Sequence, residues 1–204
     1  MEEIDELIRV LTKQEDSPQL ENQYLGESPE ARIRRQNLRR YLLQMQARKP
    51  GILLLGEAAG YKGCGITGIP FTSERVMASN PFFKDAEFQC LHADAALVSE
   101  ISATIVWGVL DKCQVLPLLW NIFPFHPHRT GNKQSNRTPD RDELEKGVFY
   151  VQLLLRIFPV KKIVALGRKA ESKLRDLGLE PDYVRHPANG GKRRFEKGIK
   201  NILL

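Results

Sequence analysis

The sequence has few cysteines and no long apolar run. Only three of its 204 residues are cysteines (Cys64, Cys90 and Cys113), and no two of them form a Cys-x-x-Cys pair. This argues against a disulfide framework or a structural zinc site, and it is typical of a reducing compartment. No apolar run approaches the roughly 18 residues of a membrane span, and the acidic start lacks the features of a signal peptide. We therefore expect an intracellular, cytoplasmic protein with no membrane association.

Basic residues outnumber acidic ones. The chain has 31 Lys and Arg against 25 Asp and Glu, which gives a net charge of +6. A basic balance favours polyanionic partners, of which DNA and RNA are the common ones. Part of this charge forms one face of a predicted helix, which is either solvated or in contact with DNA; its residues are Arg32, Arg34, Arg35, Arg39 and Arg40. We expect a monomer.

Strand and helix patterns alternate along most of the chain. Short apolar runs are expected of strands buried on both faces of a parallel sheet, and they occur at 52–55, 115–120, 163–166 and, more weakly, 183–184. Helical patterns lie between them, at 97–110, 140–158 and 168–177. This alternation predicts an α/β fold with three layers, α/β/α, around a short, mostly parallel four-stranded sheet.

The first 28 residues are predicted to lie outside the main domain. Apolar residues at helical spacing indicate a short amphipathic helix near the start, and residues 13–28 are polar and turn-rich, as in a linker. Ser28-Pro29 then provides an N-cap and a proline at the first helical position. We predict one catalytic domain over residues 29–204.

Distinctive segments follow three of the four strand candidates. Ligands bind parallel sheets at the carboxyl ends of the strands. Segment 56–73 is rich in glycine, Asn121 follows the second strand, and segment 185–194 combines a His-Pro turn with two glycines and basic residues. Each has a plain alternative: a flexible surface loop, a turn residue, and a basic helix start with a structural histidine. Their combination favours a ligand site.

Together these segments resemble the uracil-DNA glycosylase superfamily over residues 30–202, and most closely its iron–sulfur branch, family four. The resemblance rests on the order of Gly56-Glu57-Ala58-Ala59-Gly60, Gly68-Ile69-Pro70-Phe71, Asn121, Asn136-Arg137-Thr138-Pro139, Ile163-Val164-Ala165-Leu166-Gly167-Arg168 and His186-Pro187-Ala188-Asn189. It implies an enzyme that flips uracil, or a related deaminated base, out of DNA and hydrolyses its N-glycosidic bond. As a monofunctional N-glycosylase it would leave an abasic site.

The resemblance also implies roles for individual residues. Phe71 would stack on the base, with a core aromatic as the plain alternative, and Asn121 would read the N3 and O4 edge. His186 would hydrogen-bond O2, where negative charge develops as the base leaves. Ala58 belongs to the base pocket and stands where many members have Asp or Asn, so we assign the positioning of water, or stabilisation of the sugar cation, to Glu57.

The chain departs from the family in two further ways. The iron–sulfur branch holds its cluster on four cysteines, whereas this chain has three, and Phe125 occupies the region of one of them. We therefore expect no cluster, no other cofactor and no metal. The Tyr that blocks thymine in the best-known branch corresponds to Gly60, so strict uracil specificity is not implied.

The expected partner is DNA that contains uracil or another deaminated base. Candidate DNA-binding residues are Arg137, Gly190, Gly191, Lys192 and Arg193. Two alternatives remain open at this stage: a catalytically weak or inactive protein of the same fold that binds damaged or single-stranded DNA, which Ala58 favours, and a nucleotide-binding α/β protein that uses the glycine loop for phosphate.

Overall fold

The computed structural model describes residues 1–84, 87–92 and 96–203; residue 204, the last of the predicted domain, lies outside this range. The elements in chain order are α1 (Glu2–Leu11), β1 (Leu20–Glu21), α2 (Pro29–Arg48), β2 (Ile52–Ala58), α3 (Cys64–Thr67), α4 (Glu74–Ser79), the 3-10 helix η1 (Pro81–Phe83), α5 (Ile101–Leu110), β3 (Leu118–Phe123), β4 (His126–Pro127), α6 (Arg141–Ile157), β5 (Lys162–Leu166), α7 (Arg168–Asp176), β6 (Asp182–Val184) and α8 (Lys192–Leu203).

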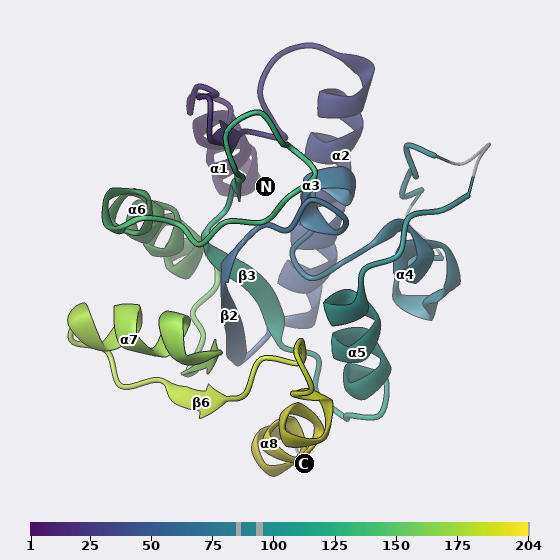
Figure 1. Ribbon diagram of the computed structural model, residues 1–204. Helices are drawn as coiled ribbons and strands as arrows, with labels where there is room; N and C mark the ends of the chain where they lie inside the picture. Colours follow the sequence, from purple (N-terminus) through teal and green to yellow (C-terminus); the bar gives the residue numbers. More distant parts are fainter. Residues whose placement is uncertain (85–86, 93–95, 204) are drawn as a thin grey trace.

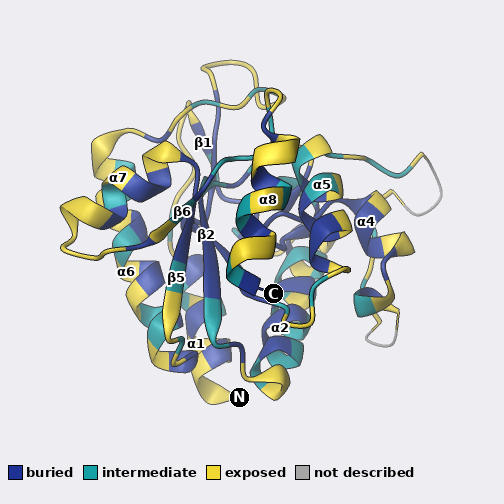
Figure 2. Cartoon of the chain, turned by 90° about the horizontal axis from the view of Figure 1, so that it is seen from below, coloured by how far each residue is buried: buried dark blue, intermediate teal, exposed yellow. Residues whose placement is uncertain are grey.

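The central sheet has four parallel strands in the order β3-β2-β5-β6. Helices α6 and α7 cover one face, and α2, α5 and α8 cover the other (Figures 1 and 2). The apolar runs of β2 and β3 are buried, as strands covered on both faces require. The predicted three-layer α/β/α fold with a four-stranded parallel sheet is thus confirmed.

The predicted position of the second strand was wrong by three residues. Val115 is 44% exposed, and β3 begins at Leu118, after Pro117, then continues to Phe123. The strand extends because β2 is also longer than predicted, so that Gly56 pairs with Asn121 and Ala58 with Phe123. Asn121 therefore lies within a strand rather than after it.

The N-terminal segment shares the core of the domain. Ile4, Leu7 and Leu11 of α1 are buried, and α1 contacts both α2 and α6. Within the segment predicted as a linker, β1 pairs with β4, and the buried Tyr24 donates a hydrogen bond to the carbonyl of Gly68. Residues 1–28 therefore pack as part of the structure rather than as a free extension.

The arginine face of α2 contacts protein groups. Arg34 and Arg35 donate to the backbone carbonyls of Ile66 and Tyr24, and Arg39 pairs with Asp5 at 2.6 Å. These bonds attach α1, the segment after it and the glycine loop to α2. No helix in the described part of the chain is long and apolar enough to cross a membrane.

Close packing of α6 on β3 depends on Gly147. A Cβ atom at this position would overlap the carbonyl oxygen of Ile122. We predict that Gly147→Ala lowers the free energy of unfolding by about 1–3 kcal/mol, because the helix has to move away from the strand. Urea unfolding measures this change. The matched control is Gly108→Ala in α5, where nothing lies within 4 Å; alanine should leave stability unchanged or raise it by about 0.5–1 kcal/mol. Equal stability of both variants would show that the contact is not tight.

Candidate active site

A cavity of about 540 Å³ opens at the carboxyl ends of the parallel strands. Six of the ten predicted site residues line it: Glu57, Ala58, Phe71, Asn121, Arg137 and His186. The other four, Gly190, Gly191, Lys192 and Arg193, form the turn before α8 and its first residues, outside the lining of the cavity. The structure thus brings together residues that are up to 129 positions apart (186 − 57) in the sequence.

Phe71 and Asn121 lie together against the backbone of Gly56. A Cβ atom at Gly56 would overlap the Phe71 ring and lie 2.7 Å from Asn121 Oδ1. Phe71 itself has a φ of 53°, a left-handed conformation that costs a non-glycine residue about 1–3 kcal/mol. The residue is 8% exposed and lines the cavity. The structure accepts backbone strain to hold this ring beside the asparagine.

The amide of Asn121 is buried and incompletely satisfied. Only 2% of the residue is exposed, and Oδ1 has no hydrogen-bond partner among the described residues. A buried polar atom without a partner costs about 1–3 kcal/mol. Since the side chain is part of the cavity lining, a ligand that enters the cavity meets this amide.

Glu57 places a second unpartnered oxygen in the cavity. Its Oε1 atom is buried without a hydrogen bond in the described structure, and Lys169 Nζ lies 3.6 Å away. Burial raises the pKa of the Glu57 carboxyl, while the Lys169 cation works in the opposite direction. Lys169 also contacts the hydroxyl of Thr138. The lysine therefore favours the ionised form of Glu57 in a partly desolvated site.

His186 is held as a neutral hydrogen-bond donor. The backbone N–H of Ala188 donates to His186 Nδ1 at 3.2 Å, which assigns the ring proton to Nε2. Burial, and then the charge of Arg185, lowers the pKa of the imidazole. Gly191 makes the turn possible, because a Cβ atom there would overlap the carbonyl oxygen of His186. Gly191 is thus required by the His-Pro turn itself.

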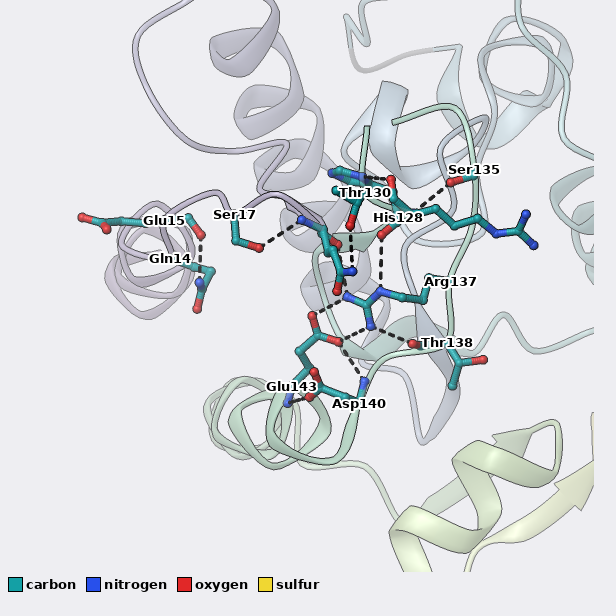
Figure 3. Close-up of polar contacts among 12 residues, drawn as sticks. Gln14, Glu15, Ser17, His128, Thr130, Ser135, Arg137, Thr138, Asp140 and Glu143 are labelled. Atoms are coloured by element: carbon teal, nitrogen blue, oxygen red, sulfur yellow. Dashed lines mark hydrogen bonds and ion pairs between the residues drawn. The ribbon is translucent and has the colours of Figure 1, made fainter. Parts of the chain in front are cut away.

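Arg137 lines the cavity and is the centre of a network of polar contacts (Figure 3). All five of its N–H donors have protein acceptors: two carboxylate oxygens of Glu143, at 2.7 and 2.9 Å, and the backbone carbonyls of Gln19, His128 and Thr138. Hydrogen bonding to Glu143 raises the pKa of the guanidinium group. The residue fixes segment 136–138 to the start of α6, and a DNA contact through it remains a prediction.

Several lining residues escaped prediction from the sequence. Lys169 is the second residue of α7 and follows the end of β5 closely, a position where ligands bind parallel sheets. Asn136 accepts a hydrogen bond from the backbone of Tyr61 at 3.1 Å and so joins two walls. Glu100, at the start of α5, carries no signal in its local sequence. Only the tertiary fold places Glu100 in the cavity.

The cysteines do not fit an iron–sulfur cluster. Cys64 lies in the core, where its sulfur contacts Gln23 Nε2 and the hydroxyl of Tyr24. Burial raises the pKa of its thiol to about 12, whereas a cluster ligand has to be a thiolate. Within residues 1–84, 87–92 and 96–203 no group of three or more His, Cys, Asp or Glu side chains could hold a metal ion.

Fold and site together define an α/β protein with a polar, strand-end pocket that holds an aromatic floor, a free amide, a carboxylate and a neutral imidazole. Among solved structures, the crystal structure of wild-type Pedobacter heparinus SMUG2 is similar, with a TM-score of 0.65 and 16% sequence identity. The match covers 98% of this chain and 95% of that chain. At this identity the similarity shows the fold. No protein-family model and no curated protein matches the sequence.

The contact between Lys169 and Glu57 yields a prediction about charge. Because the lysine lowers the pKa of Glu57 against the effect of burial, Lys169→Met should raise the pKa of that carboxyl. The ionised form would then be lost at a higher pH than in the parent protein. NMR titration of the Glu57 carboxyl carbon measures the shift. Lys173→Met is the matched control, since Lys173 is one turn further along α7 and lies 3.9 Å from Glu145 instead. An unchanged Glu57 pKa in Lys169→Met would show that the ion pair has no electrostatic effect.

Proposed function

We propose that this protein is a monofunctional DNA N-glycosylase. It flips uracil, or a related deaminated base, out of DNA and hydrolyses the N-glycosidic bond, which leaves an abasic site. The observation that carries the proposal is the free amide oxygen of Asn121, buried beside the Phe71 ring in a cavity that also holds Glu57 and His186. Further support comes from the solved structure of Pedobacter heparinus SMUG2, which has a similar fold over nearly the whole chain.

Base recognition follows from the chemistry of the amide. Asn121 Oδ1 accepts from the N3–H of uracil, and its NH₂ group donates to O4. Cytosine presents the opposite polarity at both positions, so the same amide orientation rejects it. Stacking of a base on an aromatic ring contributes about 1–3 kcal/mol without reference to sequence. Phe71 thus supplies affinity for the flipped base, and Asn121 supplies discrimination.

Bond cleavage requires stabilisation of charge at two places. As the bond between C1′ and the base breaks, its electron pair goes to the base, and the Nε2–H of His186 donates to the O2 atom that becomes negative. The sugar becomes cationic, and ionised Glu57 stabilises it and orients water. The water oxygen then bonds to C1′, and its proton passes to the carboxylate or to solvent. Ala58 has no polar group to contribute.

DNA binding is assigned to the exposed start of α8. Lys192 and Arg193 are exposed and follow the turn that carries His186. Gly190, with a φ of 74°, and Gly191 bring the backbone of this turn close to the His-Pro segment. Contacts from these residues to phosphates release counterions, so binding should weaken as salt increases.

Base release from a lesion panel tests the proposal. We expect the parent protein to free uracil from single-stranded, G·U or A·U oligonucleotides without cutting the strand. His186→Ala should slow release roughly 10²–10³-fold, because it removes one donor to developing charge, with a much smaller loss of DNA affinity. Gly108→Ala, a substitution outside the cavity, is the control and should release uracil at the rate of the parent protein. If no uracil, hypoxanthine or xanthine is released at high protein concentration, the glycosylase function is wrong. DNA binding without base release would then support the DNA-binder alternative that Ala58 favours, and tight binding of a mononucleotide would support the nucleotide-binding one.

Replacing the amide by a carboxylate tests base reading. Asn121→Asp removes the donor to O4, so uracil release should fall by about one to two orders of magnitude, which corresponds to about 1.4–2.7 kcal/mol. The preference for uracil over cytosine should narrow or disappear. Single-turnover release of both bases measures the ratio. Should the variant keep the rate and preference of the parent, Asn121 does not read the base.

A further inference from the structure

A second acidic side chain faces the cavity and has no part in the mechanism above. Glu100 immediately precedes α5, and its carboxyl group lies against the glycine loop. A Cβ atom at Gly60 would lie 2.6 Å from Glu100 Oε1, and one at Gly63 would overlap the carboxyl group. Two glycines therefore leave the space that this carboxyl occupies, and Glu100 lines the cavity together with Asn121, Phe71 and His186.

The surroundings of Glu100 differ from those of Glu57. Glu57 has the Lys169 cation at 3.6 Å, whereas Glu100 forms no ion pair with any residue that the structure describes. Two of the cavity's other basic groups are engaged elsewhere, Arg137 with Glu143 and Arg168 with Glu171. The remaining titratable groups that face the cavity are Cys64 on the glycine loop, and Arg185 and His186 after β6.

We propose that Glu100 is a base-reading residue, whose protonated carboxyl group donates a hydrogen bond to a carbonyl oxygen of the flipped base. The inference rests on the glycosylase function proposed above and adds a specificity determinant to it. The Glu100 carboxyl, which lies against Gly60 and Gly63, would then be a hydrogen-bond donor to bases that carry a carbonyl oxygen, such as uracil, hypoxanthine and xanthine.

Donation requires that the carboxyl keep its proton near neutral pH. Burial raises the pKa of Glu100 to about 7, and only the backbone N–H of Ala103 acts against this rise. Below that pH the group is a donor; above it, the carboxylate can only accept, and it repels a carbonyl oxygen. Release of a keto base should therefore decline as pH rises through about 7. This loss is on the alkaline side, opposite to the acid-side loss expected from protonation of Glu57.

A purely structural role of Glu100 would give a different pH profile. Glu100 is the N-cap residue of α5, and a carboxylate there stabilises the helix through its dipole. If capping is the only role, substitution lowers the free energy of unfolding and leaves the alkaline side of the pH profile as it is in the parent.

Single-turnover uracil release, measured below and above the pKa of Glu100, separates the base-reading role from the capping role. Glu100→Gln keeps a donor and cannot ionise, so its alkaline decline should disappear, and above the pKa of Glu100 it should exceed the parent rate several-fold. Glu100→Ala has no donor and should be about tenfold slower below that pH. Glu180→Gln, at an exposed position remote in sequence from the cavity residues, is the matched control and should follow the parent throughout.

The failures are distinguishable. A parent protein that releases no base overturns the glycosylase function and this inference with it. A parent that releases uracil while Glu100→Gln retains the same alkaline decline overturns only the role of Glu100. Should the variants fold poorly, the parent provides a second measurement: NMR titration of the Glu100 carboxyl with and without DNA containing 2′-fluoro-2′-deoxyuridine, which resists cleavage. Binding should raise the pKa of Glu100, and an unchanged or lowered pKa contradicts the proposal.

Discussion

The parallel pairing of Gly56 with Asn121 is the constraint on which the site depends. This register between β2 and β3 places the amide beside a residue that has no side chain, and the space above that residue is filled by the Phe71 ring. A shift by one residue would turn Asn121 toward the opposite face of the sheet, because side chains alternate along a strand. The buried apolar residues on both sides of Asn121 hold the register. Core packing and the proposed recognition of the base thus depend on the same strand pair.

The titratable groups that line the cavity have different surroundings. Lys169 favours an ionised Glu57, and burial, followed by the charge of Arg185, lowers the pKa of His186. Glu100 lies against Gly60 and Gly63 and forms no ion pair with the residues that the structure describes. Two carboxyl groups in one pocket can hold different protonation states at the same pH when their surroundings differ in this way. The arrangement suits a reaction in which the base becomes negative and the sugar positive.

The sequence predicted those parts of the molecule that local patterns determine. The four strands, the parallel sheet and the residues of the glycine loop and the His-Pro turn follow from apolar runs and strand-end motifs. The start of β3 was misplaced because Val115 continues the apolar run, although only residues after Pro117 pair with β2. Lys169 and Glu100 were missed because their importance comes from contacts with residues distant in the chain, Glu57 and the Gly60–Gly63 turn. Likewise, the arginines of α2 were recognised as a charged face, but their partners in the N-terminal segment depend on tertiary packing.

The unsatisfied groups of the pocket explain why it is held by so much of the chain. Asn121 Oδ1 and Glu57 Oε1 have no hydrogen-bond partner among the described residues, and Phe71 has a left-handed backbone, so each of these features costs stability. Such costs persist only where the surrounding structure prevents relaxation, and here segments that are far apart in the chain do so. Arg137 joins segment 136–138 to α6 and to Gln19, while Asn136 joins the same segment to the glycine loop. A ligand that donates hydrogen bonds to the two oxygens offsets the cost of their burial, so the groups that destabilise the fold also favour binding.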